Sequence, residues 1–141
     1  MATLRETLLA TLATTLSNAG IARVSRSRVV ALQRGDLPAV IVSPSGEDVQ
    51  PYTLTSPMRI LRSLNVKIEV HARGAIPDQA ADSTAAAVHA ALLADPTLGG
   101  RAISIDEAGT EFDLEDADQP AAMLVMNYRI DYTSSVSNLS N

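Results

Sequence analysis

The stretch that decides the fold is Arg59 to Arg73, Arg-Ile-Leu-Arg-Ser-Leu-Asn-Val-Lys-Ile-Glu-Val-His-Ala-Arg. Successive side chains of a β-strand point to opposite faces of a sheet. One parity is apolar and contains Ile60, Leu64, Val66, Ile68, Val70 and Ala72. The other parity is mostly polar and contains Ser63, Asn65, Lys67, Glu69, His71 and Arg73. The stretch therefore predicts one long strand with a buried face and a solvent-exposed face. Arg62 alone breaks the pattern.

A second long strand is predicted at about 121–133, near the C-terminal end of the sequence. The parity that is expected to be buried consists of Ala122, Leu124, Met126, Tyr128, Ile130 and Tyr132. The polar residues between them include Asn127, Arg129 and Asp131. The alternation is again that of a strand with one wet face.

Two helices are predicted from apolar residues that recur every three or four positions. The first covers 3–18, where Thr3 and Glu6 have the spacing of a capping box and Gly20 follows as a stop signal. The second covers 78–94 and buries a stripe of small residues, and Pro96 ends it because the residue before a proline avoids the helical conformation.

Short strands are predicted at 21–24, 37–42 and 102–106, with polar connections at 43–57 and 106–119. This order of elements predicts an α+β fold. It has two layers: a mainly antiparallel mixed sheet, and two helices packed on one of its faces. We expect a single domain over 1–133 and a flexible C-terminal tail over 134–141.

Composition excludes several classes of protein. The 141 residues are 46% hydrophobic, which is enough for a core, and they include no cysteine, which excludes disulfides and thiolate metal sites. The net charge of -5 argues against nucleic acid as the main partner. No segment has the apolar length of a membrane span, so we expect a soluble, non-secreted protein with no membrane partner.

The sequence contains no recognisable catalytic motif, and we expect neither an enzyme nor a bound cofactor or metal. His71 and His89 are the only histidines, and they lack a metal-binding spacing. Gly99 and Gly100 follow a helix instead of joining a strand to one, so they do not form a nucleotide-binding loop. An acid/base pair of carboxylates is left open, because acidic residues are too common to single out two.

Charge is unevenly distributed along the chain. Arg23, Arg26, Arg28 and Arg34 lie within twelve positions, and the segment 106–119 holds seven of the sixteen acidic residues. Both segments are compatible with solvated loops. They also suit a ring in which one surface of each subunit meets a different surface of the next. The candidate subunit or tube contacts are Arg23, Arg26, Arg28, Glu47, Asp48, Glu111, Asp113, Glu115 and Asp116.

Several short segments occur in a familiar order. Leu37-Pro38-Ala39-Val40-Ile41-Val42 precedes a polar connection, Ile68-Glu69-Val70-His71-Ala72 ends the long strand, and Ile76-Pro77-Asp78 opens the second helix. Tyr128-Arg129-Ile130-Asp131-Tyr132 lies in the last strand. Together with the first helix and the length, this order resembles the tail terminator proteins of long-tailed bacteriophages, the minor tail protein U type. The resemblance covers most of 3–133, but not the arginine-rich segment, the acidic run or the tail.

The resemblance implies a structural protein that forms a six-membered ring. Such a ring caps the growing tail tube, stops its polymerisation and presents a surface for joining the head. The implied partners are further copies of the chain, the tail tube protein and a head–tail connector or neck protein. The implied location is the virion tail, assembled in the host cytoplasm.

Two alternative functions are kept. One is another neck or tail-completion protein of a phage or a phage-derived particle. The other is a small-molecule-binding α+β domain or enzyme, which would need a deep pocket with converging polar groups.

Overall fold

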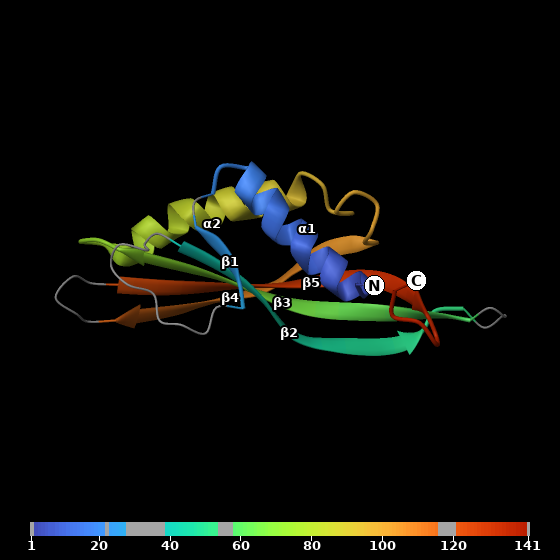
Figure 1. The fold of residues 1–141 in the computed structure, drawn as a ribbon. Coiled ribbons are helices and arrows are strands. Elements are labelled where there is room, and N and C mark those ends of the chain that lie inside the picture. Colours follow the sequence, from blue (N-terminus) through green and yellow to red (C-terminus); the bar gives the residue numbers. More distant parts are fainter. Residues whose placement is uncertain (1, 22, 28–38, 54–57, 116–120, 141) are drawn as a thin grey trace.

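The computed structural model describes residues 2–21, 23–27, 39–53, 58–115 and 121–140. Within these ranges the chain forms two helices and five strands (Figure 1). In chain order they are α1 (Leu4–Asn18), β1 (Val24–Arg26), β2 (Ala39–Pro51), β3 (Arg59–Arg73), α2 (Pro77–Leu93), β4 (Ser104–Glu115) and β5 (Ala121–Ser135).

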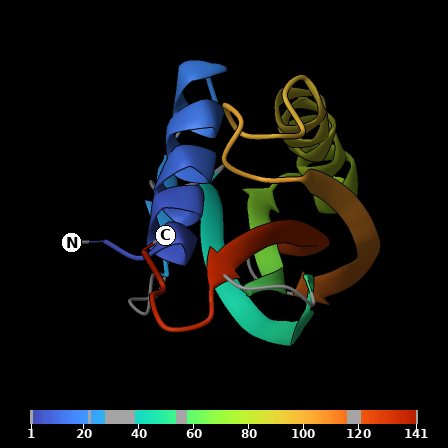
Figure 2. The same ribbon diagram turned by 90° about the vertical axis from the view of Figure 1, so that its right-hand side faces the viewer.

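The strands make one sheet in the order β1-β2-β3-β5-β4. β1 runs parallel to β2, and every other pair of neighbours is antiparallel. Both helices lie on the same side of this sheet (Figures 1 and 2). The predicted α+β fold, with two helices on one face of a mainly antiparallel mixed sheet, is confirmed.

β3 occupies the centre of the sheet, and its alternation sets the two faces. It pairs with β5 from Arg59 to Arg73 and with β2 from Ile60 to His71. Leu64, Val66, Ile68, Val70 and Ala72 are buried under the helices, as the sequence predicts. We call this side the helix face and the other side the opposite face.

The core is aliphatic and lies between the helix face and the two helices. α1 contributes leucines, and α2 contributes small residues that allow it to lie close to the sheet. The buried residues of the helices are Leu8, Leu9, Leu12 and Leu16 in α1, and Ala81, Ala85, Val88 and Leu92 in α2. β5 adds its even-numbered residues, among them Tyr128 and Ile130.

The helix ends follow the local sequence signals. The hydroxyl of Thr3 accepts a hydrogen bond from the backbone N–H of Glu6 at 3.1 Å, which is one half of the predicted capping box. Gly20 follows α1 with a φ of 86°, a left-handed conformation that glycine adopts without strain. α2 begins at Pro77, where a proline is well tolerated because the first N–H of a helix has no partner within it.

The predicted polar connections were wrong over 43–51 and 106–115; residues 54–57 and 116–119 lie outside the described residues. Residues 43–51 continue β2, and residues 106–115 continue β4. β2 is therefore 13 residues long and β4 is 12 residues long. Each becomes a strand because a long neighbour, β3 or β5, supplies a ladder of backbone hydrogen bonds that only one bulge interrupts.

Smaller differences occur at the ends of other strands. The first short strand begins at Val24, three residues later than the start we predicted, and the last strand runs to Ser135 instead of ending at Thr133. The two ends of the chain lie close together, since the backbone N–H of Leu4 donates to the carbonyl of Leu139 at 2.8 Å (Figure 1). The flexibility of 134–141 and the single-domain boundary stay predictions.

Candidate functional site

A β-bulge in β2 changes which of its residues face the helices. Val40 and Val42 pair with β3 and face the core, but the register shifts between Pro44 and Gly46, so no residue of β3 lies directly opposite Ser45. Beyond this bulge, Glu47 lies opposite Leu64 on the helix face. One extra residue therefore moves an odd-numbered acid onto the face that even-numbered valines occupy earlier in the strand.

Glu47 is the centre of a polar network beside the core. Its carboxylate accepts from Arg5 at 2.7 Å and from Arg62 at 3.2 Å. The hydroxyl of Tyr132 donates to its other oxygen at 2.5 Å. The side chains of Glu47 and Arg62 are only 10% and 14% exposed. Arg62, the residue that broke the alternation of β3, is thus the buried partner of an acid from β2.

The same network extends to the end of β5. Nε of Arg62 donates to the hydroxyl of Ser134 at 2.8 Å, and Ser134 is fully buried. Burial raises the pKa of the Tyr132 phenol, and the hydrogen bond to Glu47 raises it further. Because α1, β2, β3 and β5 all contribute, the network fixes the β2–β3 hairpin against the first helix. The carboxylate of Glu47 is held by this chain's own residues.

β4 is an edge of the sheet and carries the acidic residues. Asp106, Glu107, Glu111 and Asp113 are all exposed on it. Glu115 is its last residue, and Asp116 lies outside the described residues. Arg129 of β5 contacts Asp106 at 3.5 Å.

Two large apolar side chains of β4 are also exposed. Phe112 is 64% exposed and Leu114 is 63% exposed. They lie opposite Leu124 and Ala122 of β5, which places them on the helix face, while Glu111 and Asp113 lie on the opposite face. The outer half of β4 thus shows apolar side chains on one face and carboxylates on the other.

The other edge of the sheet carries arginine. β1 is the last strand on that side, Arg23 precedes it with an exposed side chain, and Arg26 ends it. Both terminal nitrogens of Arg26 donate to Glu6 of α1 at 3.1 Å, and these bonds lower the pKa of that carboxyl. Arg28 and Arg34 lie outside the described residues. Arg23 and Arg26 therefore lie at one edge of the sheet, and Glu111, Asp113 and Glu115 lie at the other. The candidate contacts Glu47 and Asp48 lie on β2, inside the sheet.

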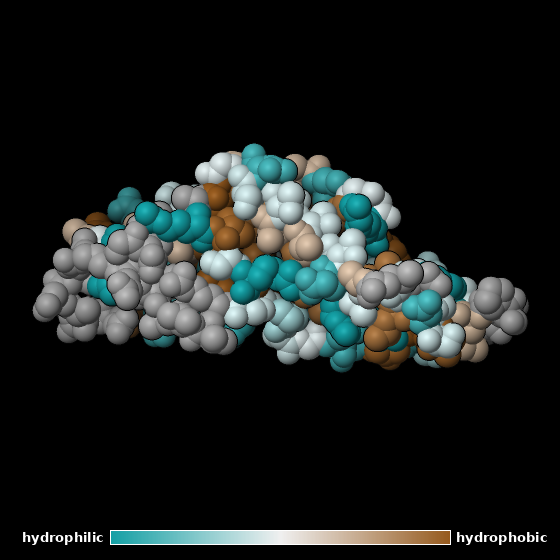
Figure 3. All heavy atoms as spheres, viewed as in Figure 1, coloured by the Kyte–Doolittle hydropathy of each residue, from teal (hydrophilic) through white to brown (hydrophobic). Residues whose placement is uncertain are grey.

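The far end of the β2–β3 hairpin is a third exposed region. Asp48 is exposed there, and so are Val49 and Tyr52. In Figure 3, apolar atoms gather at the right of the visible face, at the end of the molecule where the two termini lie. Asp48 does not lie opposite the arginines of β1. β1 pairs with Val40 to Val42, and Asp48 lies further along β2, beyond that pairing.

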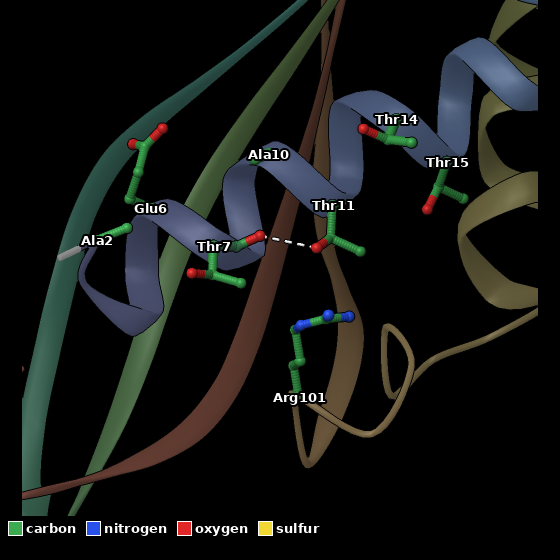
Figure 4. A pocket seen from close by; sticks show the side chains of 8 residues that line it. All are labelled: Ala2, Glu6, Thr7, Ala10, Thr11, Thr14, Thr15 and Arg101. Atoms are coloured by element: carbon green, nitrogen blue, oxygen red, sulfur yellow. Dashed lines mark hydrogen bonds between the residues drawn. The ribbon is translucent and has the colours of Figure 1, made fainter. Parts of the chain in front are cut away.

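One hollow lies on the outer side of α1, with a volume of about 440 Å³ (Figure 4). Its lining residues are Ala2, Glu6, Thr7, Ala10, Thr11, Thr14, Thr15 and Arg101. The hydroxyls of Thr7 and Thr11 donate to carbonyls of their own helix. Its carboxylate, Glu6, is paired with Arg26. Within this hollow, no second acid converges with Glu6 as acid/base chemistry would require.

The two histidines lie on different sides of the sheet. His71 belongs to the opposite face of β3, its Nε2 is 4.0 Å from Glu69, and burial lowers its pKa. His89 of α2 shares a 2.8 Å hydrogen bond with Tyr128 of β5. Nowhere in the described ranges do three or more histidine, aspartate or glutamate residues gather in a way that could hold a metal ion. None of the helices seen in those ranges has the length and apolarity needed to cross a bilayer.

Tyr128 makes the stability of the fold sensitive to alkaline pH. Burial raises the pKa of its phenol from 10.0 to about 12. Above pH 10 the unfolded phenol loses its proton while the folded one keeps it, so we expect stability to be intact below pH 10 and to fall as the pH rises towards 12. The melting temperature of Tyr128→Phe should decline less over this interval. Tyr52→Phe, at an exposed position, is the control and should decline like the parent chain; equal declines for both variants would contradict the assignment.

Comparisons with known proteins give no family. No family model matches the chain, and no curated protein sequence matches it. Among solved structures, a chain of the "Virion of native gene transfer agent (GTA) particle" is similar to it. That alignment covers 92% of each chain with a TM-score of 0.39 and 18% sequence identity. A likeness at this score is too low to support a conclusion about function.

Proposed function

We propose that this chain is a non-enzymatic structural protein of a phage virion, which caps the end of the tail tube as a ring. The ring is hexameric, as the sequence resemblance implies. It ends polymerisation of the tube and provides the surface to which the head is joined. Its partners are further copies of itself, the tail tube protein and a head–tail connector or neck protein, and it is assembled in the host cytoplasm.

The observation that carries the proposal is the placement of opposite charges on opposite edges of one sheet. A closed ring needs two different, complementary surfaces on each subunit, so that every copy meets the next in the same way. The arginine-bearing β1 and the acidic β4 are such surfaces, and three strands separate them. Charges at exposed positions contribute little energy each, ~0–1 kcal/mol, but they select which surfaces meet.

The β2–β3 hairpin end is our candidate for the tube contact. It projects beyond the helices in Figure 1 and carries exposed Asp48 and Tyr52. The Glu47 network holds the base of this hairpin against α1 and β5. A rigid arm with an exposed polar and aromatic end is suited to docking on a preformed surface. Deleting Glu47 to Leu54 would remove the network as well, so point substitutions are the sharper test.

The direct test is to mix the purified protein with tail-tube fragments and locate it by electron microscopy. We expect rings at tube ends and no further growth of the capped tubes when tube protein is added. Density at the portal instead of at tube ends would favour another neck or tail-completion protein. Binding to neither, together with tubes that continue to grow, would reject the proposal.

Substituting the hairpin end should separate capping from folding. We expect Asp48→Lys combined with Tyr52→Ser to melt like the parent chain, because both side chains are exposed, and to lose most of its occupancy of tube ends. Asp82→Lys combined with Gln79→Ser, on the exposed side of α2, makes the matching charge change elsewhere. Tube-end occupancy can be counted in micrographs, and full occupancy by the hairpin variant would remove this end from the contact.

A further inference from the structure

The second half of β4 is a regular strand at the edge of the sheet (Figure 2). Its register with β5 shifts once, between Glu107 and Gly109, and every residue from Gly109 to Glu115 then lies opposite a residue of β5. No strand among the described residues pairs with its outer side. Every second residue of an edge strand points its N–H and C=O groups away from the sheet. This half of β4 therefore presents backbone groups that a further strand can bind.

The other edge of the sheet is protected against such pairing. β1 pairs with Val40 to Val42, and β2 runs on beyond this pairing to Pro51. The stretch beyond the pairing contains Pro44, Pro51 and the bulge at Ser45. Prolines and bulges at an edge prevent a further strand from pairing. Residues 109–115 of β4 contain neither feature, so the two edges differ in what they can accept.

The side chains of this half of β4 alternate between two kinds of surface. Phe112 and Leu114 lie on the helix face and are 64% and 63% exposed. Glu111 and Asp113 are exposed on the opposite face, where apolar residues of β5 lie directly opposite them. The sheet therefore supplies no cation opposite either carboxylate, and the core does not cover the two apolar side chains.

We propose that the outer edge of β4 binds an extended segment of a different protein, which adds to the sheet as a further strand. The segment alternates apolar residues with lysine or arginine. Its apolar residues contact Phe112 and Leu114, and its cations face Glu111 and Asp113, because directly opposite residues of neighbouring strands share a face. Backbone hydrogen bonds to β4 hold the segment, and the alternation of its side chains selects it.

Charge argues against a second copy of this chain as the occupant. Two β4 edges side by side would place carboxylates opposite carboxylates, which is destabilising. The strand at the other edge, β1, has three residues, and its Arg26 lies on the helix face and is already bound to Glu6. The inference goes beyond the proposed capping function. Where the ring forms, the added strand lies at the contact between neighbouring subunits.

Synthetic peptides test the proposal with the purified protein alone. The probe is a short, fluorescently labelled peptide of alternating valine and lysine with blocked ends, and fluorescence anisotropy measures its binding. We expect saturable binding that is at least about tenfold tighter than that of a peptide with the same composition but with the valines and lysines in separate blocks. Equal affinities for the two peptides would overturn the proposal.

A third peptide separates strand addition from simple attraction of charge. It has the alternating sequence with every backbone nitrogen methylated, so it keeps its charges and cannot donate backbone hydrogen bonds. We expect it to lose most of the binding. A methylated peptide that binds as tightly as the unmodified one would show that no ladder forms on β4, and the proposal would be wrong.

Variants of β4 locate the site. Glu111→Lys/Asp113→Lys should melt like the parent chain, because both side chains are exposed, and should bind the alternating peptide at least about tenfold more weakly. Asp48→Lys/Asp82→Lys makes the same change of charge at exposed positions of β2 and α2 and should bind it nearly as the parent does. Equal losses in the two variants would mean that the peptide responds to net charge alone, which contradicts a site on β4.

A thiol on β4 tests the choice of occupant. The chain has no cysteine, so Glu111→Cys reports self-pairing of β4 without background. Treated with a short bismaleimide, it should give no more linked dimers than Ala87→Cys on the exposed side of α2. An excess of dimers from Glu111→Cys would show β4 against β4 and overturn the inference. None of these experiments contains tail tubes, so their failure leaves the capping function to its own test.

Discussion

Replacing Glu47 by alanine is expected to lower the free energy of unfolding by about 3–5 kcal/mol, the usual cost of removing one partner of a buried ion pair. The loss leaves Arg62 with its guanidinium largely buried and, among the described residues, with Ser134 as its remaining side-chain acceptor. The hydroxyl of Tyr132 loses its acceptor at the same time. Arg5 is more exposed and can turn towards water. The prediction is checked by urea unfolding at neutral pH.

The neighbouring residue provides the control for Glu47. Asp48→Ala removes an exposed carboxylate and should change stability by no more than about 0.5 kcal/mol. The double variant Glu47→Leu/Arg62→Met should be less costly than the sum of Glu47→Leu and Arg62→Met, because neither charge is then left alone. If Glu47→Ala unfolds at the same urea concentration as Asp48→Ala, the network does not stabilise the fold.

Replacing Ile68 by alanine should lower the free energy of unfolding by about 2–5 kcal/mol. Ile68 is fully buried at the middle of β3, between Val42 of β2 and Met126 of β5. Its removal leaves a cavity below the helices that the surrounding strands cannot close without breaking their ladders. Against a total stability of typically 5–15 kcal/mol for a domain, this is a large fraction.

The adjacent position tests whether the two faces of β3 differ as described. Lys67 points to the opposite face, and its side chain is 42% exposed. We therefore expect Lys67→Ala to change stability by no more than about 0.5 kcal/mol. Chemical denaturation of both variants measures the contrast, and similar losses at 67 and 68 would mean that the sheet is buried equally on both faces.

The elements that were predicted best are those in which apolar residues recur at a regular spacing along the sequence. β3 was predicted from Arg59 to Arg73 and has these bounds in the structure. α1 and α2 were predicted within one residue at each end, because leucine or alanine recurs at helical spacing and capping residues mark the ends. In these segments local preference and burial act in the same direction.

The parts of β2 and β4 that were predicted as polar connections form strands because of their neighbours in the sheet, and their own residues do not favour a strand. Pro44, Gly46 and Asp48 are poor strand formers, and β4 carries many charges. These segments are extended because the long ladders of β3 and β5 need partners. The length of β3 could have indicated the longer β2. A strand of 15 residues would be left largely unpaired by the six-residue strand predicted at 37–42. The alternation of Phe112 and Leu114 with acids was a second such indication.

The candidate contacts were predicted as clusters of charge in the sequence. Their positions in the sheet follow from the pairing of the strands, which the sequence does not give. Sequence separates the arginines of 23–34 from the acids of 106–119, but it does not say that the first two arginines and the acids of 106–115 border one sheet on opposite sides. Glu47 was grouped with the exposed contacts because residues 43–57 were predicted to be a polar connection, in which no strand register assigns a side chain to the buried face. Arg62 was the available clue, since a lone cation on a buried parity calls for an acid nearby.

The unpaired Ser45 also bears on how relatives of this chain are to be aligned. A homologue with one residue fewer between Pro44 and Glu47 would keep its acid opposite Leu64 through an unbroken ladder. An alignment that allows no gap here would shift that acid against Asp48 or Gly46 and would score a shared ion pair as two mismatches. Distant relatives should therefore be recognised by an acidic residue aligned with Glu47 and an arginine aligned with Arg62, in an alignment that permits a gap at position 45.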